Sequence, residues 1–216
     1  MTLKAENISK TFSKNGLRNS DISLGEGQFL CITGGSGCGK TTLLNIISGM
    51  LKPDSGEVLL DGKSIYSMKE KERIKLRNEK IGYMTQGNSL IPELTVWQNI
   101  TAPSELYGRN KSDEEIFSLT KRLGIDNVVD SYPSEISGGE YRRALLARVI
   151  VLDTPLLLVD EPTSNLDEKS AAIVREVLHE EHSRGKGIAV VTHDKEFIEH
   201  STDTFELEYG GDTDEI

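Results

Sequence analysis

Short apolar runs recur along the chain, and each is bounded by glycine or by acidic turn residues. Their lengths and boundaries predict strands at 22–24, 29–32, 58–60, 81–84, 156–159, 188–191 and 205–207. Between these runs apolar residues return at helical spacing, most clearly over 170–183, where Gly185 marks the expected stop. The pattern therefore predicts a chain in which strands alternate with helices.

This alternation predicts an α/β fold whose core is a mainly parallel sheet covered by helices on both faces. The opening third differs, because turns at Gly25-Glu26-Gly27 and Asp61-Gly62 are typical of an antiparallel β subdomain. Few strand signals and several helical ones occur in 88–153, so we expect a helical subdomain inserted into a core made of 1–87 and 154–216. The whole chain, 1–216, is predicted to be one domain.

Composition is typical of a folded globular protein, with 216 residues, of which 36% are hydrophobic and 28% charged. The longest apolar stretch, 149–159, is interrupted by polar residues and is shorter than the roughly 20 apolar residues needed to span a bilayer. The first residues do not resemble a secretion signal, so we expect a cytoplasmic protein with Cys31 and Cys38 as reduced thiols. A net charge of −10 disfavours nucleic acid as a partner.

The segment 34–41 has the spacing of a phosphate-binding loop: glycine, four residues, glycine, lysine and a hydroxyl residue. Glycines let successive backbone amides point at a polyphosphate, and the start of the following helix adds positive potential. Lys40 can reach the β and γ phosphates, and Thr41 can hold magnesium. We therefore predict nucleotide contacts from Gly34, Gly35, Ser36, Gly37, Cys38, Gly39, Lys40, Thr41 and Thr42.

Two carboxylates, Asp160 and Glu161, follow the apolar run 156–159. Open α/β sheets gather their ligands at the carboxyl ends of the strands. Asp160 suits the ligand set of a magnesium ion, and Glu161 suits a general base or a group that orients water. Two acids after an apolar strand are by themselves often only a solvated strand end; with the phosphate loop they predict a nucleotide hydrolase.

A second candidate anion site lies at Ser137, Gly138 and Gly139, at the start of a helical pattern. A monomer with a phosphate loop has no need of it, which suggests the phosphate of a partner. Here the chain resembles the ATP-binding-cassette (ABC) family, whose signature is usually leucine, serine, glycine, glycine, glutamine. Ile136 replaces the leucine and Glu140 the glutamine, while the contacting Ser137 and Gly139 are kept.

Four further residues follow in the order of that family. Phe12 matches the aromatic that stacks on adenine, Gln86 the glutamine of the Q-loop, Asp167 the aspartate of the D-loop, and His193 the switch histidine. Each has an ordinary reading on its own: Phe12 as core packing, Gln86 as a surface amide and His193 as a core histidine. Their position after strands that lead to one crevice favours the functional reading.

The resemblance implies an ATPase in which two copies enclose two ATP molecules head to tail. Glu161, His193, Gln86 and Lys40 are the implied catalytic residues, and Thr41, Gln86 and Asp160 the implied Mg²⁺ site. A separate integral membrane permease is the implied second partner, which places the chain at the cytoplasmic face of a membrane. The position of Cys38 beside Lys40 further predicts a reactive thiol that ATP protects from alkylation.

Within the family, the stretch 90–100 and the residues Pro103 and Tyr107-Gly108 resemble the lipoprotein-releasing and the macrolide- or peptide-exporting branch. An ATPase of a mechanotransmitting or cell-division complex, and an amino-acid importer, remain alternatives. Family members dock the membrane subunit along 86–100, so the apolar residues of this stretch either line that groove or are buried: Leu90, Ile91, Leu94 and Trp97. The acidic tail 210–216 is expected to be disordered.

Two other classes share part of the pattern. A translation or repair ATPase of the same fold would be expected to carry two cassettes or long coiled coils, and the sequence has neither feature. A nucleotide kinase shares the phosphate loop but has no use for the 137–139 site or for His193.

Overall fold

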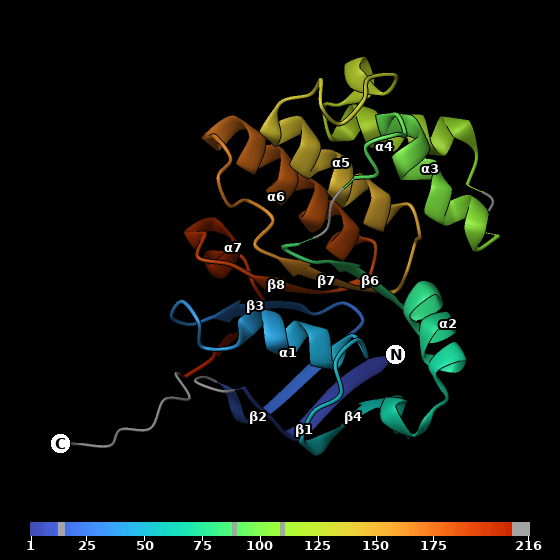
Figure 1. Ribbon diagram of the computed structural model, residues 1–216. Coiled ribbons are helices and arrows are strands. Elements are labelled where there is room, and N and C mark those ends of the chain that lie inside the picture. Colours follow the sequence, from blue (N-terminus) through green and yellow to red (C-terminus); the bar gives the residue numbers. More distant parts are fainter. Residues whose placement is uncertain (13–15, 88–89, 109–110, 209–216) are drawn as a thin grey trace.

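The computed structural model describes residues 1–12, 16–87, 90–108 and 111–208. Figure 1 shows a layered molecule in which a parallel sheet lies between a group of helices and a second, antiparallel sheet. The predicted tail 210–216 and residues 88, 89, 109 and 110 of the predicted helical subdomain 88–153 lie outside the described residues. The predicted fold class is confirmed.

Five parallel strands form the central sheet in the order β6-β7-β8-β3-β9. Their bounds are Phe29–Thr33 for β3, Ile81–Met84 for β6, Leu156–Asp160 for β7, Gly187–Val191 for β8 and Asp203–Glu206 for β9. Asp160 pairs with Val191, and Val191 pairs with Ile32, so the carboxyl ends of β7, β8 and β3 lie level with one another. The sequence predicts four of these strands closely; β9 begins two residues earlier than expected.

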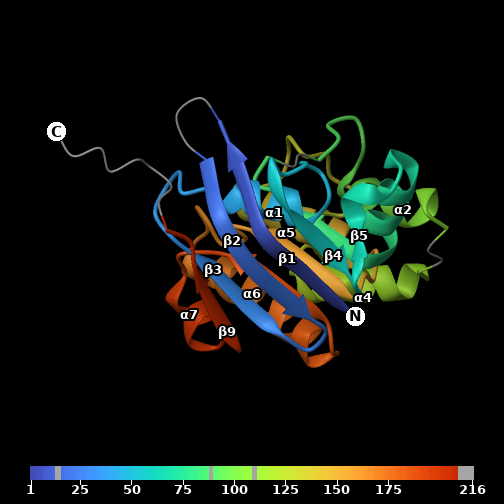
Figure 2. The same cartoon turned by 90° about the horizontal axis from the view of Figure 1, so that it is seen from below.

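The antiparallel sheet has the order β2-β1-β4-β5 and lies below helix α1, as Figure 2 shows from its outer side. Its strands are Thr2–Thr11, Gly16–Gly25, Ser55–Leu60 and Lys63–Ser64 for β1, β2, β4 and β5. β1 is missing from the strands that the sequence predicts, because its buried Leu3, Ala5 and Ile8 are separated by polar residues. The Asp61-Gly62 turn has φ values of 48° and 75°, as tight hairpin turns require.

Helices fill the rest of the chain, and every regular element described between β6 and β7 is helical. The helices are Lys40–Ile47, Glu70–Lys80, Val96–Leu106, Asp113–Arg122, Gly138–Ile150, Glu168–Ser183 and Lys195–Glu199 for α1 to α7, with 3-10 turns at Ile65–Ser67 and Asp126–Val128. α2 buries none of its residues, so it is a solvated helix. Across the described ranges, no helix combines the length and the apolarity that a membrane crossing requires.

Two apolar cores lie on the two faces of the parallel sheet. One unites β3, β6, β7 and β8 with α3, α4, α5 and α6 through side chains such as Phe29, Leu119, Leu146 and Val174. The other unites the opposite sheet face with α1 and the antiparallel strands. Because the inserted helices share a core with the sheet, the carboxyl ends of the strands and the start of α5 have fixed positions relative to each other.

Candidate active site

The loop between β3 and α1 has a backbone that only glycine can follow at its critical points. Gly34, Gly37 and Gly39 have φ values of 141°, 79° and 106°. A Cβ on Gly34 would lie 2.4 Å from the carbonyl oxygen of Leu207, so a larger residue is excluded by sterics as well as by φ. The glycine spacing in the sequence therefore reflects a folded loop that leads directly into α1.

Lys40 begins α1 and turns its side chain back under this loop. Its Nζ donates to the carbonyl oxygens of Gly34 at 2.7 Å and Gly35 at 2.8 Å, and the residue is only 9% exposed. These bonds hold the ammonium group in the concave side of the loop. Cys38 differs from expectation: it is 1% exposed and belongs to the core below the loop, so ready alkylation of this thiol is not supported. The Cys38 Sγ instead packs below the loop, 3.9 Å from Lys40 Nζ.

Asp160 ends β7 beneath the start of α1 and is fully buried. Its Oδ2 accepts a hydrogen bond of 2.7 Å from Thr41 Oγ1, while its Oδ1 has no hydrogen-bond partner among the described residues. Burial raises the pKa of Asp160, although the Thr41 hydroxyl and the nearby Arg142 and Lys40 oppose that rise. A buried carboxylate oxygen that accepts no hydrogen bond, next to a hydroxyl oxygen, forms a pair of oxygen ligands that suits Mg²⁺.

Glu161 and His193 stand at the ends of adjacent strands. Glu161 Oε1 lies 3.7 Å from His193 Nε2, and the Glu161 backbone amide donates to Val191 O at 2.9 Å. The Glu161 φ of 51° is left-handed, which is rare for a residue with a side chain. Burial raises the pKa of Glu161, His193 lowers it, and the carboxylate of Asp160 raises it further. A water molecule near Glu161 would meet a carboxylate held more basic than an exposed one.

These groups surround one pocket of about 290 Å³. The lining comprises Ser36, Gly37, Gly39, Lys40, Thr41, Thr42, Gln86, Asp160, Glu161, Val191 and His193. Gln86 is exposed in the turn after β6 and also lines the pocket. The lining combines loop amides and the Lys40 ammonium with the carboxylates of Asp160 and Glu161, as a site for a metal-bound polyphosphate requires.

The predicted second anion site lies at the start of α5, outside this pocket. Ser137 is the N-cap: its Oγ accepts from the Glu140 amide at 3.3 Å, and Glu140 Oε2 accepts from the Ser137 amide at 2.8 Å. Ser137 Oγ also donates to Glu140 Oε2 at 2.7 Å, and these hydrogen bonds lower the pKa of Glu140. Ser137 and Gly138 are exposed, so the helix start is open to another molecule.

Comparison with known proteins decides the family. The family model described as "ABC transporter" matches residues 17–164. The chain belongs to the ABC transporter family. It is an ATP-binding subunit of an ABC transporter and an ATPase.

Similar proteins match this cassette over nearly its whole length. The lipoprotein-releasing system ATP-binding protein LolD of Buchnera aphidicola subsp. Schizaphis graminum is 35% identical, covering 96% of this chain and 94% of its own. The ABC transporter ATP-binding protein YtrE of Bacillus subtilis is 34% identical, covering 90% and 85%. The dimeric structure of MJ0796, a bacterial ABC transporter cassette, is 32% identical with a TM-score of 0.87, covering 95% and 94%. A second MJ0796 structure, 31% identical with the same TM-score of 0.87 and covering 96% of both chains, is a dimer in a post-hydrolysis state bound to ADP and Pi.

Among the residues predicted to bind nucleotide, Gly34, Gly35 and Cys38 of the phosphate loop do not line the pocket, and neither do Phe12 and Asp167. Phe12 is 46% exposed just after β1, beside residues that the structure does not describe, so its contact with adenine stays a prediction. Asp167 is the N-cap of α6, where Oδ1 accepts from the Ser170 amide at 2.9 Å and Oδ2 from Ser170 Oγ at 3.0 Å. These hydrogen bonds lower the pKa of Asp167.

The structure also adds residues that the motifs of the cassette do not reveal. Asn99 is fully buried in α3, and its Nδ2 donates to the carbonyl oxygens of Ile91, Leu94 and Thr95 at 3.0 Å each. It therefore holds the segment 91–95 against the start of α3. Leu90 is buried, Ile91 is 39% exposed, and the other two apolar residues, Leu94 and Trp97, are half-buried, so this stretch is divided between core and surface.

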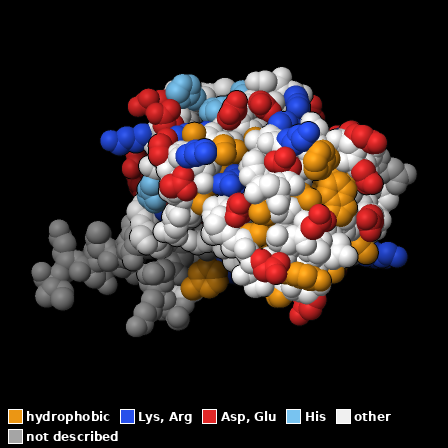
Figure 3. Space-filling view, turned by 90° about the horizontal axis from the view of Figure 1, so that it is seen from above, with side chains coloured by type: hydrophobic (Ala, Val, Ile, Leu, Met, Phe, Trp, Pro, Cys, Tyr) orange, Lys and Arg blue, Asp and Glu red, His pale blue; other side chains and the backbone are white. Residues whose placement is uncertain are grey.

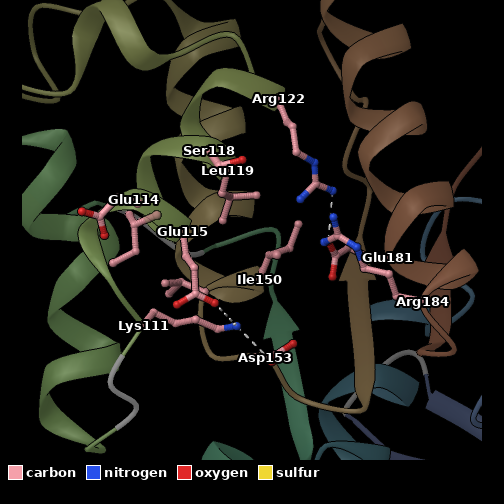
Figure 4. A pocket seen from close by; sticks show the side chains of 12 residues that line it. Lys111, Glu114, Glu115, Ser118, Leu119, Arg122, Ile150, Asp153, Glu181 and Arg184 are labelled. Carbon is pink, nitrogen blue, oxygen red and sulfur yellow. Dashed lines mark hydrogen bonds and ion pairs between the residues drawn. The ribbon is translucent and has the colours of Figure 1, made fainter.

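A second pocket of about 440 Å³ lies between α4, α5 and α6. Its charged residues pair with one another: Lys111 Nζ lies 3.1 Å from Asp153 Oδ2, and Arg122 Nη2 lies 3.0 Å from Glu181 Oε1 (Figure 4). On the face of the cassette seen from the helical side, acidic and basic side chains are intermixed, with apolar side chains exposed among them (Figure 3). The Arg122–Glu181 pair joins α4 to α6, the Lys111–Asp153 pair joins the segments before α4 and after α5, and the pocket presents no uniform charge.

Proposed function

We propose that this cassette drives a membrane export complex of the lipoprotein-releasing kind, in which two copies close on two molecules of Mg·ATP. The observation that carries the proposal is the separation of two complementary half-sites on one chain. One half-site is the pocket lined by Lys40, Asp160 and Glu161. The other half-site is the start of α5, where the exposed Ser137 and Gly138 lie outside that pocket. A head-to-tail pair brings each half to its complement. Full-length similarity to LolD supports the export branch.

Inside the pocket we assign the triphosphate to the loop 34–41 and to Lys40. Thr41 Oγ1, Asp160 Oδ1 and Gln86 would hold Mg²⁺, which supplies positive charge against the phosphoryl oxygens. Glu161 would orient the attacking water, with its carboxylate aimed by the adjacent His193. His193 and Lys40 would stabilise the charge that develops on the transferred phosphoryl group.

Ser137 and Gly139 would contact the γ-phosphate held by the partner copy. The exposed N-terminus of α5 supplies backbone amides and a positive helix end for that contact. The triphosphate then links the two copies, and hydrolysis removes the link. Phe12 is assigned to adenine and Asp167, at the start of α6, to the seam between the copies.

An integral membrane permease is the proposed second partner. Gln86 lies both at the pocket and at the start of the 90–100 stretch, so it can relay the state of the nucleotide to a subunit docked there. Ile91, which is 39% exposed in that stretch, offers an apolar contact. This assignment places the cassette at the cytoplasmic face of the membrane.

Isolation of the tagged chain from membranes of its own organism tests the proposal. We expect a permease with four spans and a large external domain to copurify, as in the export branch that the sequence resembles. A control with Ile91→Glu should retain ATP hydrolysis by the isolated cassette and lose the permease. A copurified permease with the many spans of an importer, or none at all, contradicts the assignment.

A further inference from the structure

Two arginines of α5 turn back into their own chain, next to the exposed start of the helix. Arg142 Nη2 donates to the carbonyl oxygen of Asp160 at 2.8 Å and also to that of Glu161. Arg143 Nη1 donates to Ser170 Oγ at 2.7 Å, and that hydroxyl donates to Asp167 Oδ2 at 3.0 Å. The helix that presents Ser137 is therefore tied directly to the segment that presents Glu161.

The bond from Arg142 acts where the backbone is strained. Glu161 has a φ of 51°, and this conformation persists only where the surroundings fix it. Its amide donates to Val191 O at 2.9 Å, and its carbonyl accepts from Ser164 Oγ at 3.0 Å, from the Ser164 amide at 3.3 Å and from the Arg142 guanidinium. The Ser164 donors belong to the turn that follows Glu161, whereas Arg142 reaches the carbonyl from another helix and is cationic, which makes its hydrogen bond the stronger kind. Arg142 is therefore the donor among these that links the orientation of Glu161 to α5.

Anchoring α5 does not require this arginine. The same helix buries Ala144, Leu145, Leu146 and Ala147 in the core that it shares with the sheet. Arg142 lies only five residues after Ser137, so a small tilt at the start of α5 moves the guanidinium together with the serine.

We propose that Arg142 is a positioning residue that holds the Asp160–Glu161 backbone in its reactive conformation and makes it respond to contacts at Ser137 of the same chain. The second half of this statement rests on the proposed two-copy site. In that site, nucleotide bound in the partner's phosphate loop contacts Ser137 and fixes the start of α5. Arg142 of the same α5 then fixes the position of Glu161 in its own chain, which belongs to the other of the two ATP sites. The two ATP sites are thus coupled through one side chain in each copy.

Single variants give the first measurement. Arg142→Met keeps the length of the side chain and removes its donors, and we expect kcat to fall about 10- to 100-fold because Glu161 loses its alignment. ATP affinity should stay within about twofold, since the phosphate loop is untouched. Arg142→Lys keeps a cationic donor and should recover part of kcat. Arg148→Met, a matched change in the last turn of the same helix, should leave kcat unchanged.

Dimers that contain one copy of each of two variants then distinguish two explanations. Arg142 either positions Glu161 of its own chain, or its replacement damages α5 in general. The rate of a single round of ATP cleavage is measured for a limiting amount of one protein mixed with an excess of an inactive Glu161→Gln partner, so that cleavage reports only the limiting chain. In the first arm Arg142→Met is in the limiting active chain. In the second arm it is in the inactive partner, whose signature completes the active site. The reference has Arg142 in both chains.

We expect the large fall in the cleavage rate in the first arm only. An equal fall in both arms, a fall in the second arm alone, or no fall in either overturns the assignment of Arg142. If the limiting wild-type chain cleaves ATP equally fast with and without excess partner, at a concentration where it is a single copy on its own, the two-copy site itself fails. The comparison of Arg142→Met with Arg142→Lys within one chain still decides the positioning role in that case.

Discussion

Two neighbouring carboxylates of the site have different surroundings and therefore different chemistry. Asp160 is fully buried, with Thr41 on one oxygen and an unpartnered second oxygen, so it is fitted to a cation. Glu161 reaches the pocket from a left-handed backbone position, and its burial raises its pKa. The first acid is suited to binding, and the second to activating water.

Replacing Glu161 by Gln should separate these roles. The amide keeps the size of the side chain but cannot accept a proton from water, so we expect phosphate release to fall at least about 100-fold. ATP affinity should be retained, because Lys40 and the loop amides are unchanged. Steady-state phosphate release and equilibrium nucleotide binding measure the two effects.

Glu168→Gln is the matched control, because Glu168 begins α6 with a side chain that is 84% exposed. It should hydrolyse ATP at the wild-type rate. Turnover of Glu161→Gln at that same rate would remove Glu161 from the role assigned to it.

At the scale of elements, two helices begin with the same hydrogen-bonded arrangement but in different surroundings. Ser137 and Glu140 form a capping box on α5, and Ser112 and Glu115 form one on α4. A capping serine satisfies an otherwise free backbone amide in the first turn of its helix. Both serines therefore stabilise a helix, but only Ser137 is also assigned to the partner's nucleotide.

Ser137→Ala and Ser112→Ala should each lower the free energy of unfolding by about 0.5–2 kcal/mol, the usual effect of losing a capping side chain. Only Ser137→Ala should also weaken ATP-dependent pairing and turnover. Denaturant unfolding and phosphate release measured on both variants make the comparison. Equal effects of the two variants on turnover would show that Ser137 acts as a helix cap alone.

Prediction from sequence succeeds for elements whose chemistry is local. The phosphate loop, the acidic end of β7 and the start of α5 are recognisable because their function requires particular residues at fixed spacing. β1 is missed because its alternating burial lacks a continuous apolar run. Arg142 and Asn99 are missed because their hydrogen bonds reach backbone groups whose position depends on the assembled fold. No spacing rule marks such contacts.

For the whole molecule, a group of buried ion pairs holds the inserted helices against the core. Glu181 of α6 is 1% exposed, and its oxygens lie 3.0 Å from Arg122 Nη2 of α4 and 2.8 Å from Lys186 Nζ before β8. Burial alone would raise the pKa of Glu181, but Lys186 and Arg122 outweigh it, so the pKa is lowered. Without this carboxylate, Lys186 keeps only Asp153, at 2.9 Å, and Arg122 keeps only Glu180, and these two carboxylates are 51% and 41% exposed.

Glu181→Gln should lower the free energy of unfolding at pH 7 by about 1–3 kcal/mol, the usual effect of losing a hydrogen bond to a charged group. Because the pKa of Glu181 is lower in the folded state, its contribution is complete above the unfolded pKa near ~4.3 and is lost as pH falls through the folded value. The difference between variant and wild type should therefore shrink below about pH 4. Denaturant unfolding at several pH values measures it.

Glu180→Gln is the matched control, because Glu180 also pairs with Arg122, at 2.6 Å, but its side chain is 41% exposed. An exposed pair contributes about 0–1 kcal/mol, so this variant should unfold almost as wild type does. Equal destabilisation by both variants would contradict the importance of the buried pair.

The central claim is that ATP joins two copies of the cassette and that its cleavage separates them. Sedimentation velocity of the Glu161→Gln protein tests this claim most directly. We predict dimers with saturating Mg·ATP, single copies with Mg·ADP, and single copies with Mg·ATP when Ser137→Ala is added. Single copies of Glu161→Gln at saturating Mg·ATP, or dimers that form equally well with Mg·ADP, would contradict the account.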